Sequence, residues 1–181
     1  MATFEQKEEF ELGDATSVLA ATPEALFSLL KDLPDSWLNF KEEPDAWSPR
    51  TVLVHYIHNE KTNWMPRVRV TLSGAEVRRF PPFQQLPDLG EYEVFNLQQL
   101  LGTFADLRQG NLVELQNLNI KPADYSTEAE HPVLGTVNLR QLLASWVVHD
   151  LNHLHQISKT LAKRYREEVG PWRVNLPVLD L

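Results

Sequence analysis

Apolar residues recur at steps of three and four in four segments of this chain, which is the spacing of amphipathic helices. The longest of these segments covers residues 131–168. Gly135 and Thr136 offer a break and a cap at its start. Gly170-Pro171 should end it, because glycine suits the position after a helix and proline cannot continue one. The apolar positions are Leu139, Leu142, Leu143, Trp146, Val147, Leu151, Leu154, Ile157 and Leu161.

Two further helices are marked by a capping residue followed by proline. Thr22 is a suitable N-cap, and Pro23 suits the first helical position because its missing N–H needs no partner there. Ser48 and Pro49 repeat this signal and predict a helix over about residues 49–64.

A third long apolar stripe predicts a helix over residues 94–118. Residues 66–92 are mixed and contain several prolines, which disfavours regular structure. The basic stretch at 65–70 fits either a helix that continues after a kink or an extended segment. Four helical patterns without a strong strand pattern predict an all-α four-helix bundle, formed by residues 1–181 as a single domain.

Two histidines, His149 and His153, lie four residues apart in the longest helical segment. This spacing places both imidazoles on one face, about 6 Å apart along the helix axis, where they can share a metal ion. The alternative is a pair of structural histidines in the core. Gln156 returns to the same face and can hydrogen-bond to one of them, whereas His155 faces elsewhere.

A bundle brings side chains of different helices together in its core, so His55 of the second helix can complete a site with His149 and His153. Three neutral histidines with open coordination positions are typical of a catalytic metal site. For the neighbouring His58, an ordinary core or surface position is favoured.

Composition narrows the range of partners. The net charge is −8, which argues against nucleic acid, because phosphate binding needs a basic face. The chain has no cysteine, which excludes disulfides, thiolate nucleophiles and thiolate-bound zinc and fits a cytoplasmic protein. The N-terminal residues have no apolar core of a signal peptide, and no apolar run is long enough for a transmembrane helix.

The residues resemble the DinB superfamily, whose YfiT-like members are regarded as metal-dependent enzymes. The resemblance covers nearly the whole chain, from Thr22-Pro23 to Gly170-Pro171-Trp172-Arg173. It rests on two motifs, which are Trp47-Ser48-Pro49-Arg50-Thr51-Val52-Leu53-Val54-His55 and, further on, His131-Pro132-Val133-Leu134-Gly135 with His149-Asp150-Leu151-Asn152-His153-Leu154-His155-Gln156-Ile157.

This resemblance implies an up-down-down-up four-helix bundle with a divalent metal, often nickel or zinc, on three histidines. His55 matches the ligand of the second helix, and His149 and His153 match the pair of the fourth helix. Family members are often homodimers. Where an activity is assigned, it tends to be transfer of a low-molecular-weight thiol, isomerisation or hydrolysis, each acting on a small-molecule substrate.

The leading hypothesis is therefore an enzyme whose metal activates water or an external low-molecular-weight thiol. Glu60 and Asp150 are candidates to orient a ligand histidine or to act as a base, with an ordinary solvated carboxylate as the alternative for each. Two other hypotheses stay open: a non-catalytic metal- or small-ligand-binding module, and a metal-free dimerisation protein. The ligand set accepts zinc, nickel, copper, iron or manganese.

Overall fold

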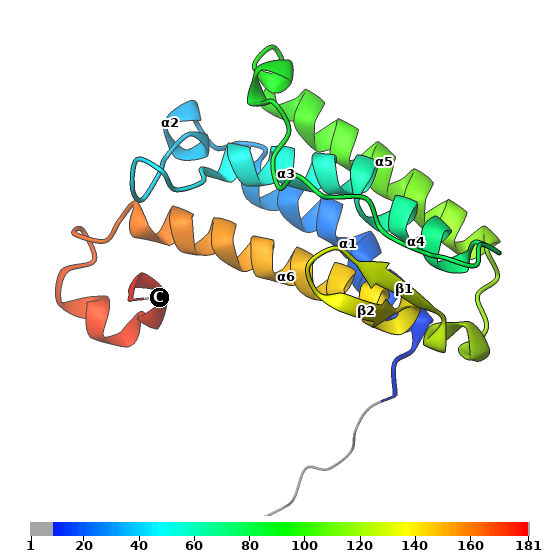
Figure 1. The fold of residues 1–181 in the computed structure, drawn as a ribbon. Helices are drawn as coiled ribbons and strands as arrows, with labels where there is room; N and C mark the ends of the chain where they lie inside the picture. Colours follow the sequence, from blue (N-terminus) through cyan, green and yellow to red (C-terminus); the bar gives the residue numbers. More distant parts are fainter. Residues whose placement is uncertain (1–8, 181) are drawn as a thin grey trace, which may run out of the picture.

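The fold is a bundle of long helices, seen in a computed structural model that describes residues 9–180. Helices α1 and α6 run in one direction, and α3, α4 and α5 run in the other (Figure 1). The predicted up-down-down-up four-helix bundle is thereby confirmed. The elements are α1 (Leu12–Leu30), α2 (Asp35–Leu38), α3 (Pro49–Thr62), α4 (Trp64–Leu72), α5 (Leu97–Asn117), α6 (Leu139–Lys163), β1 (Glu128–His131), β2 (Gly135–Asn138) and the short 3₁₀ helices Leu89–Tyr92, Pro122–Ser126, Gly170–Asn175 and Pro177–Leu179.

Side-chain caps fix where three of these helices begin. Ser48 accepts a hydrogen bond from the backbone N–H of Thr51 and caps α3 as predicted. Asn96 begins α5 and Asn138 begins α6, each in a capping box with a glutamine three residues later. The helices predicted over residues 49–64 and 94–118 are therefore confirmed in position to within a few residues.

The prediction for the longest helix was wrong at both ends. Residues 128–138 form an antiparallel hairpin in which His131 pairs with Gly135, and α6 begins only at Leu139. Gly135 has a φ of +74°, a conformation that suits a turn and not a helix. At the other end α6 stops at Lys163, and residues 164–169 form turns. Strands this short carry too little alternation to be recognised in a sequence.

The predicted helix start at Thr22 was also wrong, because α1 runs through Pro23 without interruption. The hydroxyl of Thr22 donates to the carbonyl of Val18, one turn back. Pro23 has no N–H to give to the carbonyl of Leu19. That carbonyl accepts instead from Nη1 of Arg108 in α5, at 2.7 Å. A contact between two helices thus replaces the hydrogen bond that proline removes.

The stretch after α3 is helical, which decides between the two alternatives for residues 65–70. The chain breaks at Asn63 and continues as α4, with Pro66 in the first turn. A proline there cannot donate to the carbonyl of Thr62, the last residue of α3. No helix of the described residues is long and apolar enough to cross a membrane.

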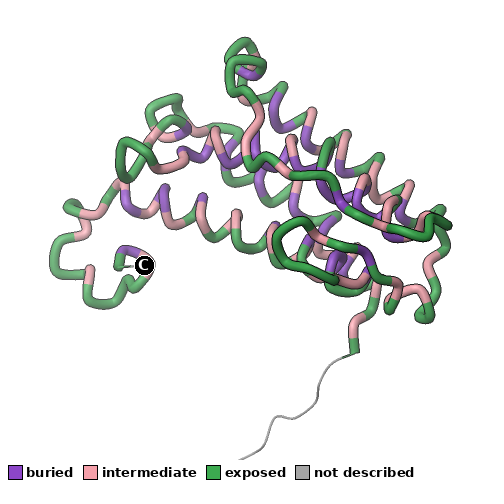
Figure 2. Tube along the Cα trace, in the orientation of Figure 1, coloured by how far each residue is buried: buried purple, intermediate pink, exposed green. Residues whose placement is uncertain are grey.

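The buried interior consists of two apolar clusters separated by a polar layer, and buried residues line the inner faces of the helices (Figure 2). One cluster is centred on Leu26, Leu53, Phe104 and Ile157, and the other on Leu19, Met65, Leu115, Leu143 and Trp146. Along each helix, polar residues lie between these two groups. The buried polar members are Thr22, His55, Asn59, Glu60, Asn63, Arg108 and Asp150.

Candidate metal centre

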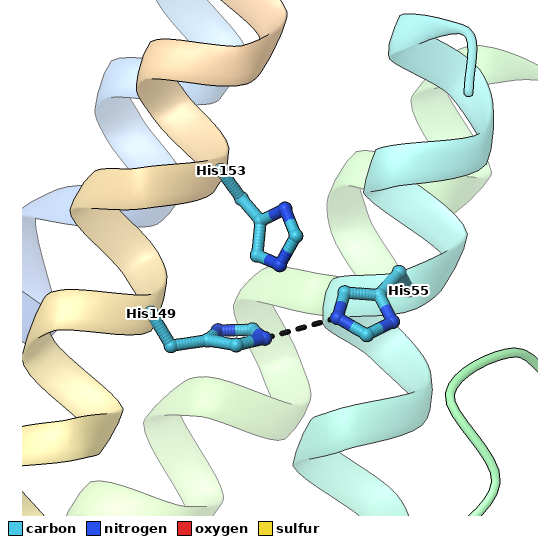
Figure 3. A group of neighbouring side chains, drawn as sticks. All are labelled: His55, His149 and His153. Carbon is cyan, nitrogen blue, oxygen red and sulfur yellow. Dashed lines mark hydrogen bonds between the residues drawn. The ribbon is translucent and has the colours of Figure 1, made fainter. Parts of the chain in front are cut away.

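Three histidines meet within this polar layer. His55 projects from the middle of α3, and His149 and His153 project from successive turns of α6 (Figure 3). One ring nitrogen of each lies within 4.8 Å of the others, and Nε2 of His55 is 3.0 Å from Nε2 of His149. Both expectations about position are confirmed: the α6 pair shares a face, and His55 lies opposite it.

Hydrogen bonds to the outer ring nitrogens leave two of the Nε2 atoms free to bind a metal. Nδ1 of His55 lies 2.6 Å from the carbonyl oxygen of Gln85, and Nδ1 of His153 lies 2.7 Å from Oε1 of Gln156. An oxygen acceptor at this distance holds the proton on Nδ1, so Nε2 carries the lone pair. Metal-bound histidines are typically oriented in this way. The predicted contact from Gln156 is confirmed.

The spacing of the nitrogens fits a divalent ion. Two nitrogens at about 2.1 Å from a tetrahedral ion are about 3.4 Å apart. The observed separations, 3.0 Å for one pair and at most 4.8 Å for the others, reach that value with small rotations of the rings. The amide nitrogen of Asn59 donates to the backbone carbonyl of His55 and also lies 3.0 Å from its Nε2. An ion at the site would replace this last contact and the 3.0 Å contact between the Nε2 atoms of His55 and His149.

Burial keeps two of the three rings neutral. It lowers the pKa of His55 to about 3, against the opposing effect of the hydrogen bond to Gln85, and the nearby His153 and His149 lower it further. Burial and the neighbouring His149 also hold the pKa of His153 below its ordinary value. Metal binding requires the neutral imidazole, so these rings need lose no proton at neutral pH before they coordinate an ion.

Aromatic rings enclose the three histidines. The ring of Trp47 lies 4.9 Å from that of His55, and the ring of Trp64 lies 5.0 Å from that of His149. Tyr56 lies edge-on to His149, and its hydroxyl donates to the backbone carbonyl of Asp150 at 2.6 Å. These rings border the site and restrict the orientations of the imidazoles.

The two candidate carboxylates, Glu60 and Asp150, both face Arg108. Its guanidinium donates to Oε1 of Glu60 at 2.7 Å and to both oxygens of Asp150, at 2.6 and 3.1 Å. The other oxygen of Glu60 accepts from Asn111 at 2.9 Å. Both carboxylate side chains are 0 % exposed, so the alternative of an ordinary solvated carboxylate was wrong for each.

Asp150 lies next to His149, one of the three candidate metal ligands. Its Oδ1 is 3.7 Å from Nδ1 of His149, which is too long for a hydrogen bond, and this buried nitrogen has no hydrogen-bond partner. Burial by itself raises the pKa of Asp150, but the contacts with His149 and Arg108 outweigh it and hold the pKa below its ordinary value. The catalytic roles of Glu60 and Asp150 stay predictions.

Sequence reasoning missed the role of Arg108. Arg108 lies in α5, and its guanidinium donates hydrogen bonds to Leu19 of α1, Glu60 of α3 and Asp150 of α6. It therefore connects four long helices of the bundle. The signal was present, because Arg108 follows Phe104 by one turn on the buried stripe of its helix. A charge on an apolar face indicates a buried partner. The contact of the Gln85 carbonyl with His55 had no signal in the sequence.

Two cavities are lined by histidines of the site, one by His153 and the other by His149. One, of about 440 Å³, is lined by Glu42, Asp45, Ala46, Trp47, His153, Gln156, Lys159 and Thr160. The other, of about 620 Å³, is mainly apolar and is lined by Trp64, Gln141, Ala144, Ser145, Val148, His149 and Asn152. The site is therefore accessible to a small molecule.

The remaining histidines lie outside the cluster. His58 is one turn from His55, but its Nε2 is 2.8 Å from the carbonyl oxygen of Gln84, in agreement with the structural position favoured for it. His155 is exposed, as its place on the helix predicted. His131 lies in β1, where Nδ1 accepts from the backbone N–H groups at the turn of the hairpin.

Comparison with known proteins places this arrangement in a family. The family model of the DinB superfamily matches residues 19–157. No curated protein matches the chain. Among solved structures, YfiT from Bacillus subtilis, described as a probable metal-dependent hydrolase with an unusual four-helix bundle topology, is 15 % identical with a TM-score of 0.69, over 91 % of this chain and 93 % of its own. TT2238, a four-helix bundle protein, is 20 % identical with a TM-score of 0.56, over 82 % of this chain and 98 % of its own. The extent of the family match shows that this protein belongs to the DinB superfamily.

Proposed function

We propose that this protein is a metal-dependent enzyme, and specifically a hydrolase, in which His55, His149 and His153 hold a divalent transition metal. One observation carries the proposal. Nitrogens from two helices converge within 4.8 Å, and the outer nitrogens of His55 and His153 are tied to oxygen acceptors, so the inner ones are available to an ion.

A divalent ion on these residues would supply Lewis acidity, which lowers the pKa of a water or thiol that binds beside it. Three protein ligands leave a position open for that molecule. The chain contributes an aromatic enclosure, and burial favours the neutral form of His55 and His153. Asp150 is proposed to orient the ring of His149, and Glu60 to hold Arg108 in place, so both carboxylates act through other residues.

Water is the proposed nucleophile, and the structural likeness to YfiT, described as a probable metal-dependent hydrolase, supports this choice. Hydrolysis joins the oxygen of water to the electrophilic carbon or phosphorus of the substrate, and the leaving group departs with a proton. A thiol is the rival nucleophile. Because the chain has no cysteine, that thiol would have to come from a second small molecule.

The first test measures metal content by plasma mass spectrometry on untagged protein. His153→Ala should lose the metal that the wild type carries. His155→Ala is the matched control, because it removes an exposed imidazole from the same helix two residues away. Absence of metal from the wild type after incubation with zinc, nickel, iron or manganese would disprove the proposal. Equal metal in wild type and His153→Ala would disprove this ligand set.

The second test measures turnover by the metal-loaded protein on a panel of esters, amides and phosphoesters, with and without added low-molecular-weight thiols. Hydrolysis that His153→Ala loses and His155→Ala keeps supports the proposal. Turnover that requires the thiol would identify a transferase instead. Stoichiometric metal without turnover on either panel would favour the non-catalytic binding module.

A further inference from the structure

We infer that Arg67 and His131 form a binding site for an oxyanion, the carboxylate or phosphate group of a small molecule. Arg67 belongs to α4 and His131 to β1. Neither residue is part of the three-histidine cluster, so the inference goes beyond the proposed function and does not depend on a metal ion. It follows from a buried cation that lacks an anionic partner and from a second hydrogen-bond donor beside it.

Arg67 carries a buried charge that the described residues leave unpaired. The residue is 8 % exposed, and its guanidinium makes no hydrogen bond or ion pair within residues 9–180. Burial lowers the pKa of Arg67, and no carboxylate raises it. Arg108, the other arginine among the buried residues, has two carboxylate partners. Because a buried charge without a partner is costly, Arg67 indicates a ligand that supplies the anion.

Two phenylalanine rings hold this guanidinium without using its N–H groups. Its central carbon lies 5.1 Å from the centre of the Phe80 ring and 5.5 Å from that of Phe83. Contact with a ring leaves the N–H groups available, and a guanidinium can bind an oxyanion through two parallel hydrogen bonds. The nitrogens of Arg67 are not among the fully buried atoms that lack a partner in the described residues, so they reach the solvent.

His131 provides the second donor next to Arg67. Its ring lies 6.2 Å from that of Phe80, so both residues contact the same phenylalanine. Burial and the positive charge of Arg67 lower the pKa of His131, which keeps the imidazole neutral at neutral pH. Nδ1 accepts from the backbone N–H groups of Val133 and Leu134, at 3.1 Å each, so the proton of the neutral ring is on Nε2. Nε2–H can therefore donate to an anion.

The acidic side chains of β1 lie on the other face of the strand. Side chains alternate between the two faces, so His131 shares a face with the buried Ala129. Glu128 and Glu130 lie on the opposite face, and both are exposed. Glu130 is paired with Arg79, at 3.0 Å. The negative charge next to Arg67 must therefore come from a ligand.

The proposed site borders two segments that contact the candidate metal ligands. Arg67 follows Trp64 by one turn of α4, and the ring of Trp64 lies 5.0 Å from that of His149. Phe83, which contacts Arg67, is two residues before Gln85, whose carbonyl oxygen lies 2.6 Å from a ring nitrogen of the ligand on α3. An anion bound at Arg67 would thus contact segments that also position the three histidines.

The test measures binding of inorganic phosphate and of acetate to metal-free protein by ¹H–¹⁵N NMR titration at constant ionic strength. We expect saturable binding of at least one anion, with the largest shift changes around Arg67 and His131. The anion that binds more tightly identifies the ligand group as a phosphate or a carboxylate. Arg67→Met should weaken binding at least tenfold, because it removes the charge and the paired donors.

Two further variants separate binding from folding. His131→Asn keeps a side-chain acceptor for the hairpin but lacks Nε2–H, so it should weaken binding about fivefold and tests the site even if Arg67→Met does not fold. Arg69→Met is the matched control, because Arg69 lies in the same helix and already donates two hydrogen bonds to Glu114. It should bind like the wild type.

The inference is overturned if the wild type binds neither anion, if the shift changes map elsewhere, or if Arg67→Met or His131→Asn binds like the wild type. A loss in Arg69→Met as large as that in Arg67→Met would also overturn it, because binding would then depend on overall charge. The titration uses metal-free protein, so a negative result leaves the proposed hydrolase untouched. A wild type that takes up no metal would, in turn, leave this inference standing.

Discussion

Replacement of Arg108 by methionine tests the network that joins the helices of the candidate metal centre. The guanidinium is 1 % exposed and makes four hydrogen bonds, to Leu19, Glu60 and twice to Asp150. Methionine is similar in length but leaves two fully buried carboxylates without their cation. Loss of one partner of a buried ion pair costs about 3–5 kcal/mol, and domains have about 5–15 kcal/mol of total stability. We therefore expect Arg108→Met to lose at least 3 kcal/mol.

The stability lost in Arg108→Met should be larger at neutral pH than at acidic pH. An unpaired buried carboxylate has a folded-state pKa above its unfolded value, so it destabilises the fold as the pH rises through that range. The difference in the free energy of unfolding between wild type and Arg108→Met should therefore become smaller as the pH falls from neutral to about pH 5. The triple variant with Glu60→Gln and Asp150→Asn removes both charges and should recover at least half of the loss.

Urea unfolding of chelator-treated protein, followed by circular dichroism, measures these free energies. Arg69→Met is the matched control, because Arg69 pairs with Glu114 at the surface, where its side chain is 53 % exposed. Such a pair contributes about 0–1 kcal/mol. The reasoning fails if Arg108→Met costs no more than Arg69→Met, or if the triple variant is no more stable than Arg108→Met at neutral pH.

Three further predictions use the same unfolding measurement. In metal-free protein, the pKa of His55 is lowered in the folded state, so the unfolded chain binds more protons than the folded one below about pH 6. This group should therefore reduce the free energy of unfolding by about 1.4 kcal/mol for each pH unit as the pH falls from about 6 to 4. His55→Leu should show a smaller dependence on pH. Gly110→Ala, within α5 and with open space around it, should stabilise by about 0.5–1 kcal/mol, whereas Gly170→Ala, at a φ of +50°, should destabilise. Ser48→Ala should cost about 1 kcal/mol, and an unchanged midpoint would contradict its role as the cap of α3.

Local features of this protein were predictable because they depend on neighbours in the sequence. Helical periodicity identified the long helices, and the cap at Ser48 placed the start of α3. The shared face of His149 and His153, and the contact from Gln156, follow from helix geometry alone. The sequence also presented His55 as the third candidate ligand, through the expected bundle and the resemblance to a family.

Tertiary structure decided the features that join distant residues. Only the packing of α3 against α6 brings Nε2 of His55 to 3.0 Å from that of His149, across 94 positions of sequence. The same packing places the Gln85 carbonyl on His55 and buries Glu60 and Asp150 around Arg108.

Pro23 shows the physical reason most clearly. Local preference places proline at the start of a helix, yet α1 continues through it. The carbonyl of Leu19 that lacks its helical donor receives a hydrogen bond from Arg108, 89 residues further along the chain. Burial and long-range hydrogen bonds can outweigh a local preference of a few kcal/mol, and they arise only when the helices assemble.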